Sequence, residues 1–231
     1  PILMMLFLQA DIFVIGKVLS MGQLGIYSLA RTLAEIPNTF LSKIINTIVL
    51  PAFSSIQDNR ERITNTLLTM TKWSAIFGLP LIAFLFIFAK PVLTIAYGPQ
   101  YGTAALPFGL LCVSGLILLN SSFIMNMYIA IGKPNIHRTA SFARTALLII
   151  MIYPAVKHFG LTGAAVSILT AMVLLLSIQL IYLRKMMGIQ YRDYIKSWAN
   201  GITFSLIVNI PGFLHKTFTV PETLRDLLIG F

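Results

Sequence analysis

Apolar runs recur along this chain, and each is long enough to cross a membrane as an α-helix. A helix that spans the hydrocarbon core of a bilayer needs roughly 17 to 25 apolar residues. The runs of this length are 1–19, 24–52, 67–89, 104–131, 139–156, 161–183 and 197–214, and a further run opens at 227–231. No segment alternates apolar and polar residues over strand lengths. The sequence therefore predicts an all-α, polytopic membrane helix bundle of about seven spanning helices plus a truncated eighth.

The composition agrees with a membrane bundle and excludes several function classes. The chain is 57% hydrophobic and 10% charged, against roughly 25% charged in an ordinary soluble domain. The single cysteine, Cys112, rules out an internal disulfide and a cysteine-type metal site. The three histidines fall in or beside predicted loops, far apart in sequence, and are interpreted as interfacial residues. We expect no metal ion and no organic cofactor.

Positive charge marks every second connection between the apolar runs. The basic connections follow the second, fourth and sixth runs, and their charged residues are Arg60, Arg62 and Lys72; Lys133, Arg138 and Arg144; Arg184, Lys185, Arg192 and Lys196. Cytoplasmic loops carry such an excess of Lys and Arg, so the first helix should run outward from the cytoplasm. These flanks account for most of the net charge of +10, and we expect no nucleic-acid partner.

Ionisable residues also occur inside the first two runs, where hydrocarbon is expected. Asp11 lies in the first run, and polar residues follow one another at steps of three or four in the second, which places them on one face of a helix. Charges at this depth normally face a bundle interior or a wet cavity. The candidate cavity residues are Asp11, Tyr27, Arg31, Glu35, Asn38, Ser42, Lys43 and Asn46. Two interpretations fit: these side chains line a polar path, or Arg31 and Glu35 form a local ion pair that locks two helices together.

A second pattern concerns the segment before the last complete run. Tyr191, Tyr194, Ile195 and Trp198 form an apolar stripe at helical spacing opposite charged residues. This pattern fits a helix lying along the membrane surface, or a partly solvated extension of the following spanning helix. The segment 53–71 presents the same two alternatives less regularly. We expect a six-helix lobe over 1–183, an interfacial amphipathic linker over 184–198, and an additional transmembrane pair over 199–231.

Both ends of the chain fall inside apolar runs, so we expect it to be an internal or C-terminal portion of a longer protein. With that expectation, the chain resembles the C-terminal half of the polysaccharide-biosynthesis flippases of the MOP (MATE-like) superfamily, the Wzx-type O-antigen and colanic-acid exporters. The segments that carry the resemblance are DIFVIGKVLS and LGIYSLA (11–30), VLPAFSSIQDN (49–59), FAKPVLTIAYGPQY (88–101), AIGKP (130–134) and FGLTGAAVS (159–167).

The resemblance implies a fold, an activity and partners. Members of this superfamily consist of two related six-helix bundles around a central cavity, so this chain would be the second bundle and its partner would be the missing N-terminal bundle. The implied activity is export, not catalysis: an undecaprenyl-pyrophosphate-linked oligosaccharide moves across the bacterial cytoplasmic (inner) membrane by alternating access. Coupling to H⁺ or Na⁺ is implied for many members, and membrane lipids are the other partners.

Other functions remain open at this stage. The nearest alternative is another exporter of the same superfamily, a lipid II flippase or a multidrug/cation antiporter. Arg31 and Lys43 favour an anionic headgroup over a cationic drug. A membrane glycan polymerase or ligase would need a substantial extramembrane loop or clustered catalytic groups, and the outer connections are short. A structural or assembly subunit is favoured if the embedded charges are fully paired and dry.

Overall fold

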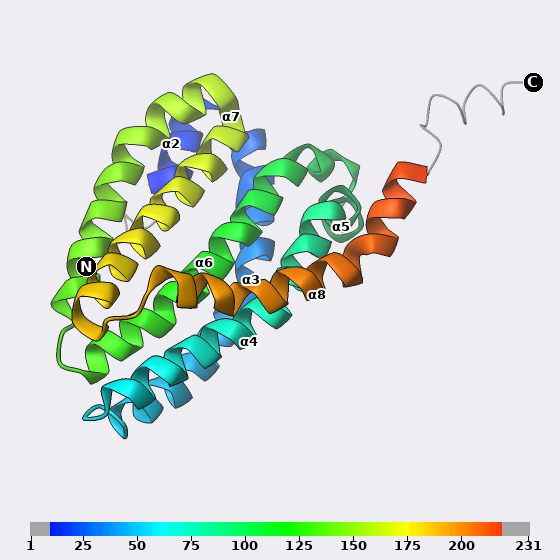
Figure 1. Cartoon of the computed structure of the whole chain (residues 1–231). Helices are drawn as coiled ribbons and strands as arrows, with labels where there is room; N and C mark the ends of the chain where they lie inside the picture. Colours follow the sequence, from blue (N-terminus) through cyan, green and yellow to red (C-terminus); the bar gives the residue numbers. More distant parts are fainter. Residues whose placement is uncertain (1–9, 219–231) are drawn as a thin grey trace, which may run out of the picture.

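The regular elements of the described chain are all helical (Figure 1). The computed structural model describes the backbone of residues 10–218 and the side chains of residues 11–39 and 48–209. Its elements are α2 (Ala10–Val18), α3 (Met21–Ser54), α4 (Arg60–Ile87), α5 (Ala89–Tyr97), the 3-10 helix η1 (Pro99–Ala104), α6 (Ala105–Ala130), α7 (Asn135–Met187) and α8 (Tyr191–Phe218). The predicted all-α fold class is confirmed.

Helix lengths agree with the predicted membrane spans. Within the described residues, three helical segments are long and apolar enough to cross a membrane: Arg60–Ile87, Pro99–Ala130 and Asn135–Met187. The helices α3 and α8 have 34 and 28 residues, which corresponds to lengths of about 51 and 42 Å. The runs predicted at 24–52, 104–131 and 197–214 fall almost entirely inside α3, α6 and α8. Residues 1–9 of the first run and the run at 227–231 lie outside the described residues.

The helix α7 is two membrane helices joined by a single residue. Gly160 has φ 57° and ψ −137°, which interrupts the helix, and a positive φ is accessible to glycine without steric cost. The chain reverses there, so the first arm (135–159) and the second arm (161–187) form a hairpin (Figure 1). The two runs predicted at 139–156 and 161–183 occupy one arm each.

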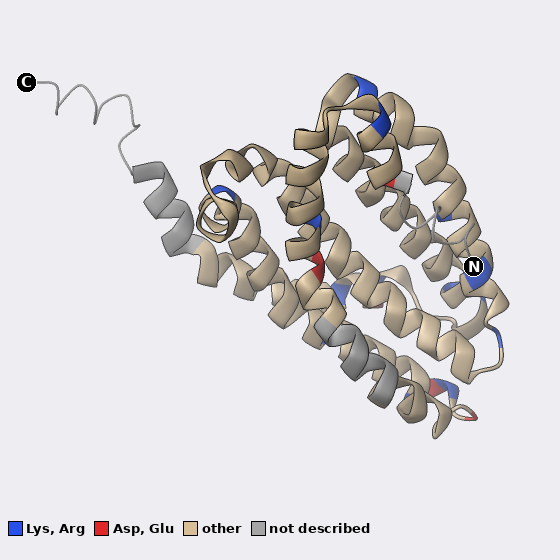
Figure 2. Cartoon of the chain, turned by 180° about the vertical axis from the view of Figure 1, so that it is seen from behind, with Lys and Arg blue, Asp and Glu red and all other residues tan. Residues whose placement is uncertain are grey.

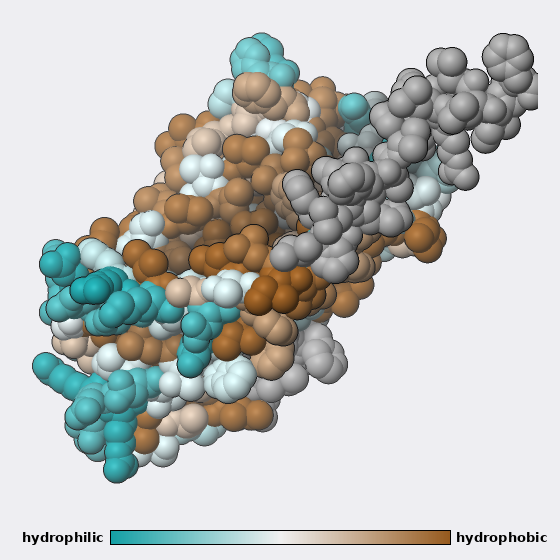
Figure 3. All heavy atoms as spheres, turned by 45° about the vertical axis from the view of Figure 1, so that its right-hand side comes forward, coloured by the Kyte–Doolittle hydropathy of each residue, from teal (hydrophilic) through white to brown (hydrophobic). Residues whose placement is uncertain are grey.

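The connections sort to two ends of the bundle. Those at 55–59, 131–134 and 188–190 lie at the same end, while Gly160 and the α2–α3 connection lie at the other (Figure 1). Hydrophilic residues gather at the first of these ends, and an apolar surface extends above them (Figure 3). This arrangement agrees with the predicted alternation of basic and weakly charged connections.

The helix α6 forms the centre of the bundle. It packs against α3, α4 and α7, and α8 packs along α4. Two hydrophobic clusters share it: Phe108 and Cys112 belong to one with α2, α3 and α7, and Ile124 and Met127 belong to the other with α4 and α8. A helix that is apolar on most sides and touches three neighbours is typical of a bundle core.

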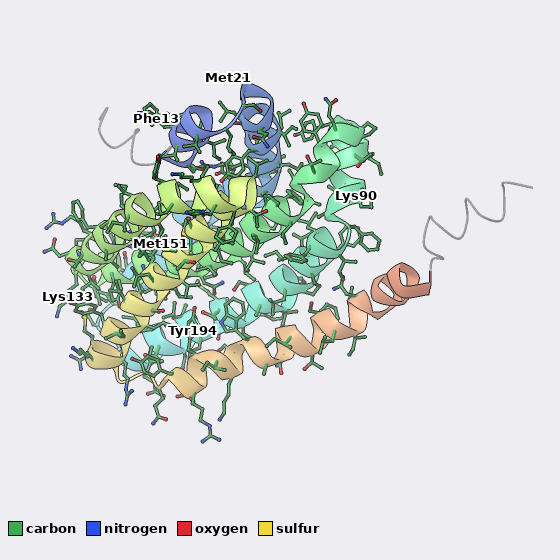
Figure 4. All side chains as sticks on the ribbon, turned by 90° about the horizontal axis from the view of Figure 1, so that it is seen from above. Phe13, Met21, Lys90, Lys133, Met151 and Tyr194 are labelled. Carbon is green, nitrogen blue, oxygen red and sulfur yellow. The ribbon has the colours of Figure 1, made fainter. Side chains whose placement is uncertain are left out.

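The amphipathic segment before the last run is not a separate surface helix. Residues 184–187 complete α7, and Tyr191–Trp198 are the first turns of α8. Tyr194 is only 4% exposed and packs in the same cluster as Ile189 and Leu183 (Figure 4). The structure therefore favours the extension of a longer helix over a helix lying along the membrane surface. The division into lobe, linker and additional pair stays a prediction.

Close approach across the α7 turn gives a first testable prediction. A Cβ atom at Gly163 would lie 1.9 Å from the backbone oxygen of Ala155, so Gly163→Ala must displace the backbone. We expect it to destabilise the protein by about 2 kcal/mol, because overpacking a rigid contact costs this much. Gly25→Ala is the matched control, because nothing lies within 4 Å of its Cβ. Thermal unfolding of the two variants would be compared, and equal midpoints would contradict the prediction.

Candidate functional site

An ion pair inside the bundle links α2 to α3. The two helices meet at a tight connection, where the Ser20 side chain caps α3 by accepting a hydrogen bond from the Gln23 N–H at 3.3 Å. The antiparallel arrangement brings Asp11 on α2 beside Arg31 on α3, and Arg31 Nη1 donates to Asp11 Oδ2. Asp11 is 1% exposed. A carboxylate this buried requires such a partner, because an uncompensated buried charge is strongly destabilising.

Two further side chains extend this pair into a chain of contacts. The Tyr27 hydroxyl donates to Asp11 Oδ2 at 3.0 Å, and Arg31 Nε donates to Glu35 Oε1 at 2.7 Å. These four residues are called the Asp11 cluster below. The predicted i, i+4 contact between Arg31 and Glu35 is confirmed. Asp11, named among the same candidate cavity residues, is a second carboxylate partner of Arg31 and comes from another helix.

Exposure increases along the Asp11 cluster. Tyr27 and Asp11 are buried, the Arg31 side chain is 20% exposed, and the Glu35 side chain is 56% exposed. One end of the cluster is therefore sealed inside protein, and the other reaches the surface of the described chain. Most charged positions lie toward the ends of the bundle, but a few lie along the middle of α3 (Figure 2). Charge at that depth is typical of a functional position in a membrane protein.

Apolar packing holds the cluster from behind. Ile15 and Ala30, on the two helices of the pair, belong to one core cluster with Ala164 and Ala165 of the second arm of α7. Small residues let α2 approach α7 closely. The Asp11 carboxylate is thus enclosed by packed helices, whereas the Glu35 side chain is exposed.

The remaining predicted cavity residues continue along α3. Asn38 is partly buried and contacts α6, since a Cβ atom at Gly115 would lie 2.2 Å from Asn38 Nδ2. The helix α3 includes Ser42, Lys43 and Asn46. The structure describes the backbone at these positions but not the side chains. The structure thus brings together Asp11, Tyr27, Arg31 and Glu35 and leaves the rest of the stripe a prediction. The pairing of Arg31 with Asp11 and Glu35 agrees with an ion pair that locks two helices together. The exposure of Glu35 agrees with side chains that line a polar path.

Sequence reasoning missed a second group of polar side chains within α7. His137 Nδ1 lies 2.9 Å from Nε2 of Gln179, and Arg144 Nη1 lies 3.7 Å from Met172 Sδ. Arg144, counted with the basic connection after the fourth run, lies inside the first arm, within the run predicted at 139–156. Spacing along one helix carries no signal for these contacts, because each pair joins the two arms of α7. Among the described residues, no three His, Cys, Asp or Glu side chains group as metal ligands would.

The fold and the cluster define a class of protein: a multi-pass membrane helix bundle with a buried ion pair between two of its helices. Comparison with known proteins then narrows the class. Residues 1–106 match the family described as polysaccharide biosynthesis protein. The resemblance to the polysaccharide-biosynthesis flippases that the sequence predicts is confirmed by this match and by the relatives described next.

Several curated relatives cover much of the chain. The lipopolysaccharide biosynthesis protein WzxC of Escherichia coli K12 is 25% identical over 80% of this chain and 38% of its own length. The amylovoran biosynthesis protein AmsL of Erwinia amylovora is 23% identical over 93% of this chain and 55% of its own length. The succinoglycan biosynthesis transport protein ExoT of Rhizobium meliloti is 29% identical over 50% of this chain and 24% of its own length.

The chain therefore spans between about a quarter and just over half the length of these relatives. No solved structure matches it at a significant level.

Proposed function

We propose that this chain is part of an exporter that moves a lipid-linked oligosaccharide, an undecaprenyl-pyrophosphate glycan, across the bacterial cytoplasmic membrane. The observation that carries the proposal is the Asp11 cluster, in which a half-buried arginine sits inside a membrane bundle between a sealed carboxylate and an exposed one. The names of the relatives, which refer to polysaccharide biosynthesis and transport, support the same activity. The process is transport without a covalent step.

The role of Arg31 follows from the charge of the substrate. A pyrophosphate carries negative charge into a region of low dielectric, and a fixed cation lowers the cost of its entry. Arginine binds phosphate oxygens with two parallel N–H donors, which makes the contact strong and directional. Asp11 and Glu35 hold the guanidinium in place. Substrate phosphate would then compete with Glu35, the more exposed of the two carboxylates.

This exchange offers a route for coupling. When a phosphate takes the place of Glu35 at Arg31, the released carboxylate is exposed and free to bind H⁺ or Na⁺. Lys43, which directly follows Ser42 of the predicted stripe, is a second candidate cation for the substrate path. The N-terminal bundle of the full-length protein would supply the opposite wall of the cavity, and the surrounding membrane lipids would seal it.

The test is complementation. A strain whose own polysaccharide flippase has been deleted would receive the full-length protein, and lipid-linked glycan would be measured on both sides of the cytoplasmic membrane. We expect surface polysaccharide to return and the inner-leaflet intermediate to decline. Accumulation of polymerised or ligated glycan in the inner leaflet would favour an enzyme instead. Collapse of the proton and sodium gradients in separate arms would identify the coupling ion.

A further inference from the structure

Arg144 is a cation inside a membrane helix. It lies about 14 Å along the axis from the start of α7, at a rise of about 1.5 Å per residue. Phe142 and Ile150, close to it on the first arm, are 69% and 72% exposed, as expected of a helix that faces lipid. An arginine at this depth is unfavourable by a few kcal/mol even on the lenient insertion scale, unless a partner compensates its charge.

The contacts of Arg144 do not supply that partner. Its Nη1 faces the sulfur of Met172 at 3.7 Å, and a thioether is a weak acceptor. Its Nε is buried and has no hydrogen-bond partner. Within residues 11–39 and 48–209, no carboxylate pairs with it. Arg31, by contrast, is held by two carboxylates. Because Arg144 has only the weak thioether contact, its guanidinium retains N–H donors for a ligand.

A hydroxyl group lies beside these donors. Ser141 precedes Arg144 by three residues and so shares its helix face, and its Oγ lies 3.2 Å from His137 Nε2. Gln179 Nε2 is a donor and faces His137 Nδ1 at 2.9 Å. With the amide in this orientation, the imidazole proton sits on Nε2 and is donated to Ser141. The Ser141 hydroxyl proton is then available to a further acceptor.

The direction of the side chain indicates where that acceptor comes from. Helical side chains lean toward the N-terminus of their helix, and long cationic side chains extend toward the membrane interface. For Arg144 this is the end of the bundle where Lys133 lies (Figure 4), and both Lys133 and Arg138 are exposed. Basic positions between helices near such an end attract anionic headgroups.

We propose that Arg144 and Ser141 bind the phosphate of a membrane phospholipid headgroup between the two arms of α7. The guanidinium supplies two parallel donors and the charge, and the serine hydroxyl supplies a third donor. The chemistry required is that of a phosphate anion, and the position of Arg144 toward the end of the bundle that carries the exposed Lys133 and Arg138 assigns it to a bilayer lipid. This site is separate from the Asp11 cluster and does not depend on the transported substrate.

The test uses the purified, delipidated full-length protein and native mass spectrometry with added phosphatidylglycerol. Diacylglycerol, which has the same tails without phosphate, is the control lipid. We expect Arg144→Gln to lower retained phosphatidylglycerol by about tenfold or more, the effect of losing a charge-assisted pair of hydrogen bonds. Arg138→Gln removes the same charge from an exposed position on the same arm and should change retention less than about twofold. Arg144→Lys should be intermediate, because it keeps the charge and loses the paired donors.

Three other outcomes would overturn the proposal. Equal loss in Arg144→Gln and Arg138→Gln would mean attraction to net charge alone, and equal retention of the two lipids would mean that only the tails bind. Displacement of phosphatidylglycerol by equimolar inorganic phosphate would assign the site to a free anion. Thermal unfolding of all variants separates misfolding from lost binding, and Arg144→Lys carries the test if Arg144→Gln does not fold.

Discussion

Replacing Arg31 with alanine is expected to abolish glycan export by the full-length protein while the protein remains in the membrane. The guanidinium is the half-buried cation of the Asp11 cluster, and the loss of a charge-assisted phosphate contact should reduce export by about a hundredfold or more. Export is measured as surface polysaccharide in the complemented deletion strain, normalised to the amount of membrane-inserted protein. Arg31→Lys should retain part of the activity, because lysine keeps the positive charge but lacks the planar set of N–H donors with which the guanidinium binds two carboxylates.

Arg138→Ala is the control for loss of charge alone, because that residue is exposed at the end of the bundle. A double variant, Asp11→Asn with Arg31→Gln, separates transport from structure. It replaces the ion pair with neutral groups that can still hydrogen-bond across α2 and α3. If Arg31 contacts substrate, this double variant also fails to export. Normal surface glycan in the double variant would show that the pair only locks the two helices together.

The second large effect concerns stability. Asp11→Ala is expected to lower the free energy of unfolding by about 3 kcal/mol, because it leaves a partly buried guanidinium without its buried partner. Glu35→Ala should cost only about 0.5 kcal/mol, since an exposed i, i+4 pair contributes little. The exposed fractions of the two carboxylate side chains, 2% and 56%, are the reason for the difference. Thermal unfolding of the purified full-length variants measures both effects.

Adding Arg31→Met to Asp11→Ala should recover part of the lost stability, because no charge is then left buried. Failure of this second substitution to recover any stability would show that the cost comes from the cavity left at Asp11 and not from the orphaned charge. Tyr27→Phe, which removes the hydroxyl that donates to Asp11 Oδ2, should cost about 1 kcal/mol.

The fold class and the positions of the helices followed from the sequence because apolar length is a strong signal. Runs such as 104–131 and 161–183 match α6 and the second arm of α7 to within a few residues. The pair Arg31 and Glu35 was also predictable, since a spacing of four fixes neighbours on one helix. These features depend only on the geometry of a single helix.

Contacts between helices were harder to predict. Asp11 reaches Arg31 because the capped connection at Ser20 turns α3 back along α2, and spacing within one helix carries no information about that angle. The contact of Arg144 with Met172 was not predictable for a related reason: the two residues lie on different arms of α7. Their approach depends on the hairpin, and its geometry depends on the backbone of Gly160.

The reversal at Gly160 also has a consequence for biogenesis. A single residue, Gly160, separates the two arms of α7. We therefore expect the arms to insert together, as a closed hairpin whose tip alone crosses to the far side. Close to this tip the arms are already in contact, because Gly163 and Ala155 leave no space for a side chain between them.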